Sequence, residues 1–310
     1  MDSQKFLQKF SLSLDTLESE LESGEDEVYS NIFVMGLPRS GSTLLTQILY
    51  NNTDLYCTNN LIARFWETPL VGTQLSKLTI PKVALSEYES FYGRTFGIDQ
   101  PHEFSRFWHQ AIKLDDFENY DPQAIAEDID WSQIKSKIIN MNKILGGGIV
   151  FKPMELVGFH LNSMAENFEK SLFIYIERDS IDVAISILRA RESSGSNEWW
   201  GSYPPAKIFQ RVKNLSLIDQ IAHQVCYFRS LYEKYFSDTN NLQLFRINYR
   251  ELCESPNQVL GEIKKAISNK NGKLTITPLA ERLKVSLSKK DSEKRTRMQC
   301  ALDLASSEYE

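Results

Sequence analysis

Short apolar runs alternate with longer segments of helical periodicity along most of the chain. The apolar runs lie at residues 31–36, 149–151, 172–176 and 242–247. Short runs rich in apolar residues, such as 149–151 and 172–176, are typical of parallel strands that are buried on both faces. Helices are expected at 42–50, 157–168, 181–191, 215–236 and after Pro256. This alternation predicts an α/β fold, a single domain with a central parallel β-sheet flanked by helices.

Residues 1–30 differ in character from the rest of the chain. Apolar side chains recur there every three or four residues, which predicts one amphipathic helix over 4–22. The segment carries eight acids and two lysines, and the other 280 residues carry 33 bases and 33 acids, so these first residues account for the net charge of −6. We expect an acidic helical arm (1–30) on a domain that spans 31–310. The arm either packs on that domain, packs on a second subunit of a homodimer, or is a solvated acidic helix.

The overall composition argues against several functional classes. A chain of 310 residues that is 42% hydrophobic can bury a large core. The balanced charge of the domain makes nucleic acid a poor partner, and no apolar run is long enough for a membrane span. The four cysteines form no C-x-x-C pair, and there are only four histidines, so we expect no metal site. Free cysteines and the absence of a secretory pattern at the N-terminus favour a cytoplasmic protein.

A possible anion-binding loop lies between the first predicted strand and the helix that follows it. Its sequence, Gly36-Leu-Pro-Arg-Ser-Gly41-Ser42-Thr43, has the G-x-x-x-x-G spacing of a phosphate-binding loop. Backbone N–H groups and a helix N-terminus converge in such a turn and attract an anion. An ordinary ATPase has lysine at the position of Ser42, whereas here Arg39 supplies the positive charge from within the turn. A glycine-proline turn without a ligand would also explain the loop taken alone.

A second cluster follows the third predicted strand. Arg178 lies at the carboxyl end of that strand, where α/β proteins form ligand sites. Ser186 lies two helical turns further on, and together the two side chains could hold another phosphate. The alternative is structural: Arg178 and Asp179 form an ion pair at a helix start, and Asp182 is a first-turn acid favoured by the helix dipole.

These motifs resemble those of the sulfotransferase family. Residues 33–45 look like the phosphosulfate-binding loop of that family, and residues 175–186 look like its 3′-phosphate-binding strand and helix. The stretch 247–252, Ile-Asn-Tyr-Arg-Glu-Leu, is similar to the Tyr-Glu-x-Leu stretch after the family's late strand. The matches occur in family order. The resemblance implies a P-loop-like sulfotransferase architecture and 3′-phosphoadenosine 5′-phosphosulfate (PAPS) as the sulfuryl donor, with no metal.

The resemblance also assigns donor-binding residues. The 5′-phosphosulfate loop corresponds to Arg39, Ser40, Gly41, Ser42 and Thr43. Arg178 and Ser186 correspond to the 3′-phosphate pair, and Tyr249 lies where a nucleotide contact is expected. Many cytosolic members carry lysine in the first loop, and other branches carry arginine, as here. A late basic loop of the family is not clearly reproduced: basic residues that could replace it, or form a solvated basic tail, are Lys289, Lys290, Lys294 and Arg295.

The implied reaction is in-line transfer of a sulfuryl group to a hydroxyl of a carbohydrate or a small molecule. Arg39 and the loop amides would stabilise the charge that develops on the leaving 5′-phosphate. A neutral hydroxyl needs a general base, yet Asn59 and Asn60 stand where many relatives place an acid. The candidates, in order, are His102, Glu67 and His109, and His160 is a further one; each histidine could equally be a structural residue.

Two other functions compete with sulfuryl transfer. A nucleotide kinase or NTPase would require a lysine at position 42 and an acid that holds a metal, and Asp179 could imitate the latter. A non-catalytic nucleotide-binding scaffold would bind the donor product without turnover. The segment 193–207, with Trp199, Trp200 and Tyr203, either gates the acceptor pocket or is a packed surface loop.

Overall fold

The structure is a computed structural model that describes residues 2–24, 26–82, 88, 90–194, 202–237, 244–279, 283, 285 and 292–309. Its centre is a parallel sheet of five strands in the order β2-β3-β1-β4-β5. The strands are β1 (Ile32–Met35), β2 (Tyr56–Cys57), β3 (Ile149–Phe151), β4 (Leu172–Glu177) and β5 (Leu244–Asn248). The α/β prediction is confirmed, and β1, β3, β4 and β5 are the expected strands; residues 242–243 lie outside the described part. The two residues of β2 are too few to leave a pattern in the sequence.

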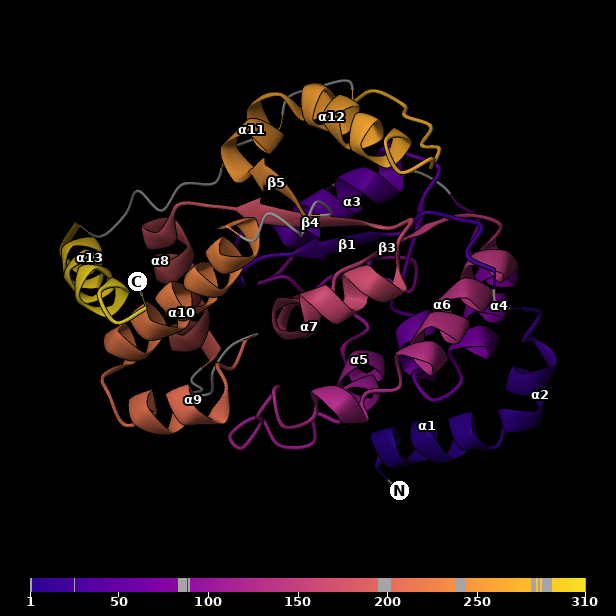
Figure 1. Cartoon of the computed structure of the whole chain (residues 1–310), viewed down its shortest axis with the longest axis horizontal. Coiled ribbons are helices and arrows are strands. Elements are labelled where there is room, and N and C mark those ends of the chain that lie inside the picture. The colour runs from indigo at the N-terminus through magenta and orange to yellow at the C-terminus, as the bar shows by residue number, and fades with distance from the viewer. Residues whose placement is uncertain are drawn as a thin grey trace.

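Helices cover both faces of this sheet (Figure 1). Side chains of β1 alternate between the two faces, as the pleat of a strand requires. Ile32 and Val34 pack in the core beneath α3 (Ser42–Asn52), α11 (Tyr249–Glu254) and α12 (Pro256–Ser268). Phe33 and Met35 belong to the larger core on the other face, where the Phe33 ring stacks on those of Phe151 and Phe173 at 5.2 and 5.0 Å between ring centroids.

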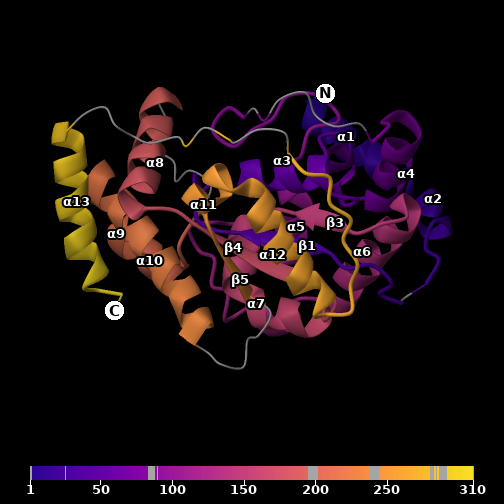
Figure 2. The same cartoon turned by 90° about the horizontal axis from the view of Figure 1, so that it is seen from above.

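The larger core is closed by α4 (Pro69–Thr79), α5 (Ser105–Ala111), α6 (Trp131–Leu145), α7 (Met154–Asn167), α8 (Ser180–Ser194), α10 (Leu217–Ser237) and α13 (Ser292–Ser306), with the short 3₁₀ turn η1 (Ile62–Phe65). The helix α9 (Ala206–Val212) buries Phe209 and Val212 in a separate small cluster, and the 3₁₀ turn η2 (Ala126–Asp128) buries no residue. Every helix expected from periodicity within residues 31–310 is present. Figure 2 shows α8, α10 and α13 side by side at the end of the molecule opposite the N-terminal arm.

The C-terminal basic segment is partly helical and partly paired. Lys294 and Arg295 lie on α13, where they form ion pairs with Glu192 at 2.9 Å and Asp182 at 2.8 Å, both on α8. These two side chains are therefore not part of a solvated tail, because the packing of α13 against α8 brings them to carboxylates more than a hundred residues away in the chain. Lys289 and Lys290 lie outside the described residues.

The prediction of one helix over 4–22 is wrong. The arm forms two helices, α1 (Ser3–Leu12) and α2 (Asp15–Glu20), with a break at Ser13 and Leu14. The Ser13 hydroxyl donates to the Phe10 carbonyl at 2.6 Å, a local bond that competes with helix continuation. The break lets both pieces follow the curved surface of the domain: α1 contacts η1, and α2 contacts α4.

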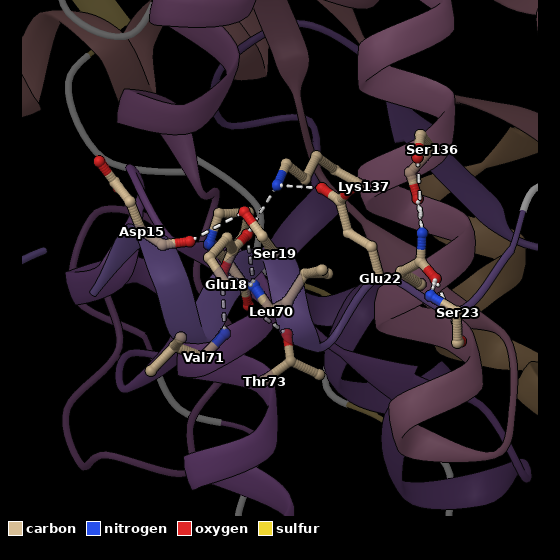
Figure 3. Close-up of polar contacts among 12 residues, drawn as sticks. Asp15, Glu18, Ser19, Glu22, Ser23, Leu70, Val71, Thr73, Ser136 and Lys137 are labelled. Atoms are coloured by element: carbon tan, nitrogen blue, oxygen red, sulfur yellow. Dashed lines mark hydrogen bonds and ion pairs between the residues drawn. The ribbon is translucent and has the colours of Figure 1, made fainter. Parts of the chain in front are cut away.

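A buried carboxylate fixes the arm to the domain (Figure 3). Glu18 of α2 accepts hydrogen bonds from the backbone N–H groups of Leu70 at 2.9 Å and Val71 at 3.0 Å, in the first turn of α4. It also pairs with Lys137 of α6 at 3.1 Å, and Lys137 in turn binds Glu22 at 2.8 Å. Burial acts to lower the pKa of Lys137, but the hydrogen bonds to Glu22 and Glu18 outweigh it and raise that pKa. The arm therefore packs on its own domain and caps one of that domain's helices.

Replacing Glu18 by alanine is expected to destabilise the protein by about 2–3 kcal/mol, because the first turn of α4 loses its acceptor and Lys137 loses a buried partner. Chemical denaturation followed by circular dichroism measures this change. The matched control is Glu20→Ala, an exposed acid of the same helix, which we expect to change the free energy of unfolding by less than about 0.5 kcal/mol. Equal effects of the two substitutions would contradict the anchoring role of Glu18.

Candidate active site

The loop after β1 has a backbone that only particular residues allow. Gly36 and Gly41 have φ values of 148° and 108°, and Arg39 lies between them with a φ of 70°. A Cβ atom on Gly41 would lie 2.5 Å from the Tyr249 ring, and one on Gly36 would lie 2.8 Å from the Ile176 carbonyl oxygen. Both positions therefore need glycine for their conformation and for space. The resulting turn leads directly into the N-terminus of α3.

The structure gathers the expected donor-binding residues at the carboxyl edge of the sheet. The Arg39 Nε donates to Ser186 Oγ at 3.1 Å, and the Arg178 Nη1 donates to the Arg39 carbonyl at 2.8 Å. The Arg178 guanidinium also lies 4.5 Å from the centre of the Tyr249 ring. These residues come from the β1–α3 loop, the β4–α8 junction, α8 and the start of α11. One edge of a parallel sheet brings them together, as in other open α/β folds.

The charges and polar atoms of this cluster are arranged to receive an anion. Burial and the neighbouring Arg178 guanidinium lower the pKa of Arg39 below its ordinary value. Two guanidinium groups held this close repel each other, and an oxyanion between them would relieve the repulsion. Ser40 is 1% exposed, and its hydroxyl has no hydrogen-bond partner among the described residues. Such an unsatisfied buried hydroxyl costs about 1–3 kcal/mol, which a phosphate or sulfate oxygen would offset.

Lys152 is a site residue that the sequence analysis missed. It follows β3 directly, is buried, and donates from Nζ to Thr43 Oγ1 of the loop at 2.9 Å. Its second partner is the carboxylate of Glu103 at 2.7 Å. A lysine directly after a buried parallel strand is a signal that could have identified it, since the carboxyl ends of these strands meet at one edge.

Lys152 therefore links the Glu103 carboxylate to Thr43, at the end of the loop after β1. Burial acts to raise the pKa of Glu103, but the adjacent Lys152 ammonium outweighs it and holds that pKa below the ordinary value of 4.5. The carboxylate is thus ionised at neutral pH. A charged acceptor next to the loop has the properties needed to take a proton from a hydroxyl.

His102 is adjacent in sequence but engaged differently. Its Nδ1 accepts a hydrogen bond from the Phe104 backbone N–H at 2.8 Å. The neutral ring therefore carries its proton on Nε2 and presents a donor there. Burial lowers the pKa of His102 below 6.5 despite the nearby Glu103 carboxylate. His102 reaches the site, but its basic nitrogen is already in use.

The other base candidates of the sequence analysis have partners away from the loop. Glu67 accepts from Trp66 Nε1 and from the Gln110 side-chain amide, both at 3.0 Å. His109 packs edge-on against Phe117, and burial lowers its pKa. His160 lies in the core with its Nε2 2.9 Å from the Tyr120 hydroxyl, and burial lowers its pKa to about 4.

The structure also gives the packing of Tyr203 and the hydrogen bonding of Asn60. The segment that carries Trp199 and Trp200 lies outside the described residues, whereas Tyr203 packs against Phe117 and Phe209, with ring centroids 4.8 and 5.5 Å apart. The Asn60 side-chain amide donates to the Gly97 carbonyl at 2.7 Å and so holds the loop that precedes His102.

Neither a metal site nor a membrane span is found in the described part of the chain. No cluster of three or more histidine, cysteine, aspartate or glutamate side chains there could ligate a metal ion. No helix over the described residues combines the length and hydropathy that crossing a bilayer requires.

Comparison with known proteins decides the family. A model described as "Sulfotransferase family" matches residues 31–268. The chain belongs to the sulfotransferase family. It is accordingly an enzyme, a sulfotransferase, and the match covers the sheet, the loop and the Arg178–Ser186 segment. Curated protein sequences provide no match to the chain.

Solved structures support the fold of this sulfotransferase. The crystal structure of sulfotransferase STF9 from Mycobacterium avium has a TM-score of 0.52 and 15% sequence identity, covering 95% of this chain and 72% of that one. Sulfotransferase STF1 from Mycobacterium tuberculosis H37Rv has a TM-score of 0.51 and 14% identity, covering 98% of this chain and 80% of that one. The shared architecture is the P-loop-like fold expected from the sequence.

Proposed function

We propose that this sulfotransferase transfers a sulfuryl group from PAPS to a hydroxyl of a carbohydrate or small-molecule acceptor. The observation that carries the proposal is the cradle formed by Arg39, Arg178 and Ser40 around two glycines of restricted conformation. Its paired guanidinium groups and unsatisfied hydroxyl suit a ligand that bears more than one phosphate-type group.

The chain's own residues divide this binding work. The 5′ end of the donor would lie on the loop amides and on Ser40, Gly41, Ser42 and Thr43, next to the α3 N-terminus. The 3′-phosphate would be held by Arg178 and Ser186, with Tyr249 beside Arg178. When bound, the donor supplies an activated sulfuryl group whose leaving group is a phosphate.

Two cations are positioned to stabilise charge during transfer. Arg39 lies within the turn, and Lys152 bonds to Thr43 at the start of α3. Because both are buried or partly buried, their charges act in a medium less polar than water. We assign them the stabilisation of the phosphate oxygen from which the sulfuryl group departs.

Glu103 is the proton acceptor that this geometry supports best. Its carboxylate is bonded to Lys152 and is ionised at neutral pH, whereas His102 has its Nδ1 occupied and Glu67 is bonded to Trp66 and Gln110. Glu103 would take the hydroxyl proton as the acceptor oxygen attacks sulfur. His102, one residue away, would orient the acceptor as a donor through Nε2.

Two parallel incubations of the protein with a mixture of phenolic and carbohydrate acceptors test this function, one with PAPS in EDTA and one with ATP and magnesium. We expect mass spectrometry to detect a sulfated acceptor and adenosine 3′,5′-bisphosphate in equal amounts. Phosphorylated acceptors formed from ATP and magnesium, with PAPS left intact, would contradict the proposal and support the kinase alternative.

A further inference from the structure

A cavity lies beside the candidate active site, with His102 in its lining. Its volume is about 470 Å³, within the usual range for small-molecule pockets. Three parts of the chain form its wall: Leu7 of α1, the segment around η1 with Trp66, and the loop 95–106 with Phe96 and Ile98. Phe96 and Ile98 are 78% and 57% exposed, so the mouth of the cavity carries apolar side chains.

The segment 92–103 connects this cavity to the loop after β1 and to the Glu103–Lys152 pair. Tyr92 and Gly93 contact the phosphate-type loop: the Tyr92 ring centre lies 5.5 Å from the Arg39 guanidinium, and Thr43 donates to the Gly93 carbonyl at 3.4 Å. The same segment continues into the cavity wall at 95–98. His102 lines the cavity, and the next residue, Glu103, holds Lys152. An acceptor bound in the cavity would therefore contact His102, the chain neighbour of the proposed proton acceptor.

The charge of the cavity wall has one sign. Its described lining includes Arg64, Arg106 and His102 and contains no carboxylate. The Arg106 guanidinium stacks over Trp66 at 4.7 Å from the ring centre. Among the described residues, the Arg64 side chain has no ion-pair partner. Arg64 and His102 line the same cavity. Burial lowers the pKa of His102 most, the Glu103 carboxylate raises it, and the Lys152 and Arg64 charges lower it further.

Glu67 supports this wall from behind. Its carboxylate holds the Trp66 indole N–H at 3.0 Å, and Trp66 in turn carries the Arg106 guanidinium on its face. The Glu67 carboxylate thus orients the Trp66 ring that lies under the Arg106 guanidinium. This leaves the cavity itself cationic, with an apolar mouth.

We infer that the acceptor is an anionic alcohol or phenol, whose carboxylate or phosphate pairs with Arg64 and Arg106 while its apolar body lies against Trp66, Phe96 and Leu7. The inference rests on the proposed function, since it places the acceptor hydroxyl toward Glu103. It also gives the N-terminal arm a part in the site, because Leu7 belongs to α1.

A matched pair of probes tests the inference: 3-(4-hydroxyphenyl)propanoate and its neutral primary amide. Both are titrated into the protein by calorimetry, with and without adenosine 3′,5′-bisphosphate. We expect the acid to bind at least about tenfold more tightly than the amide, because a charge-assisted bond to arginine exceeds a neutral one. The double variant Arg64→Ala, Arg106→Ala should reduce this preference to about twofold or less, and Lys264→Ala, an exposed residue of α12, should retain it.

The outcomes separate the inference from the proposed function. Equal binding of the acid and the amide to the wild-type protein, no binding of the acid, or an unchanged preference in the double variant would overturn the anionic-acceptor inference. Failure to bind adenosine 3′,5′-bisphosphate would instead overturn the donor assignment. The titration without the bisphosphate still measures the preference of the cavity in that case.

Discussion

Replacing Arg39 by alanine is expected to lower the rate of sulfuryl transfer about 100- to 1000-fold. Arg39 supplies positive charge within the loop, and removing one such group from a preorganised site typically has an effect of this size. The Arg39→Ala variant also lacks the hydrogen bond to Ser186, so the KM for the donor should rise as well. Steady-state kinetics with PAPS varied at saturating acceptor measures both parameters.

The conservative variant separates charge from shape at this position. Arg39→Lys keeps the charge but loses the planar fork, so we expect it to recover only part of the activity. Lys264→Ala on α12 is the control and should retain the wild-type rate. An Arg39→Ala enzyme within about twofold of wild type would contradict the role of Arg39, because such a loss is far below the expected range.

Glu103→Gln is expected to lower kcat about 10²- to 10⁴-fold, the usual contribution of a general base. Glutamine keeps the size of the side chain and an acceptor for Lys152 but cannot take a proton. In this variant, the residual kcat should no longer fall at low pH, because the group whose protonation causes that fall has been removed. Glu67→Gln should change the acceptor KM more than kcat, since Glu67 bonds to Trp66, whose ring carries the Arg106 guanidinium.

The pH profile distinguishes Glu103 from His102. A base acts when deprotonated, so activity falls as the pH falls through its pKa. The pKa of Glu103 lies below 4.5, held down by Lys152 against the effect of burial, whereas that of His102 lies below 6.5 because of burial. If Glu103 is the base, kcat/KM stays level from about pH 8 to about pH 5.5. A fall in kcat/KM below pH 6.5 that disappears in His102→Gln would identify the histidine instead.

Much of the fold and half of the site follow from local sequence patterns. The strands β1, β3 and β4 are apolar and buried on both faces, which a linear pattern records directly. The loop after β1 combines glycine spacing with an arginine inside the turn. Arg178 was visible because it follows a strand, and Ser186 because helical periodicity places it on the same side. These signals lie within about fifteen residues of one another in each motif.

The remaining features depend on contacts between distant segments. Lys152 meets Glu103 from a position 49 residues away, so the position of Lys152 after β3 does not reveal its pairing with Glu103. The break between α1 and α2 follows from the docking of Glu18 on α4, which amphipathic periodicity does not reveal. Glu67 is a candidate base because it is the acid that follows Asn59 and Asn60 in the chain, but only the folded chain shows that Trp66 and Gln110 donate hydrogen bonds to it.

The most direct measurement is calorimetric titration of the purified protein with adenosine 3′,5′-bisphosphate in the absence of magnesium, beside parallel titrations with 5′-AMP and with ATP plus magnesium. We expect tight binding that requires the 3′-phosphate and weakens about tenfold or more in Arg178→Ala, as loss of a charge-assisted contact implies. The same variant should bind 5′-AMP as the wild-type protein does. Binding of ATP with magnesium, together with no binding of the bisphosphate, would contradict the assignment of a PAPS site to this loop.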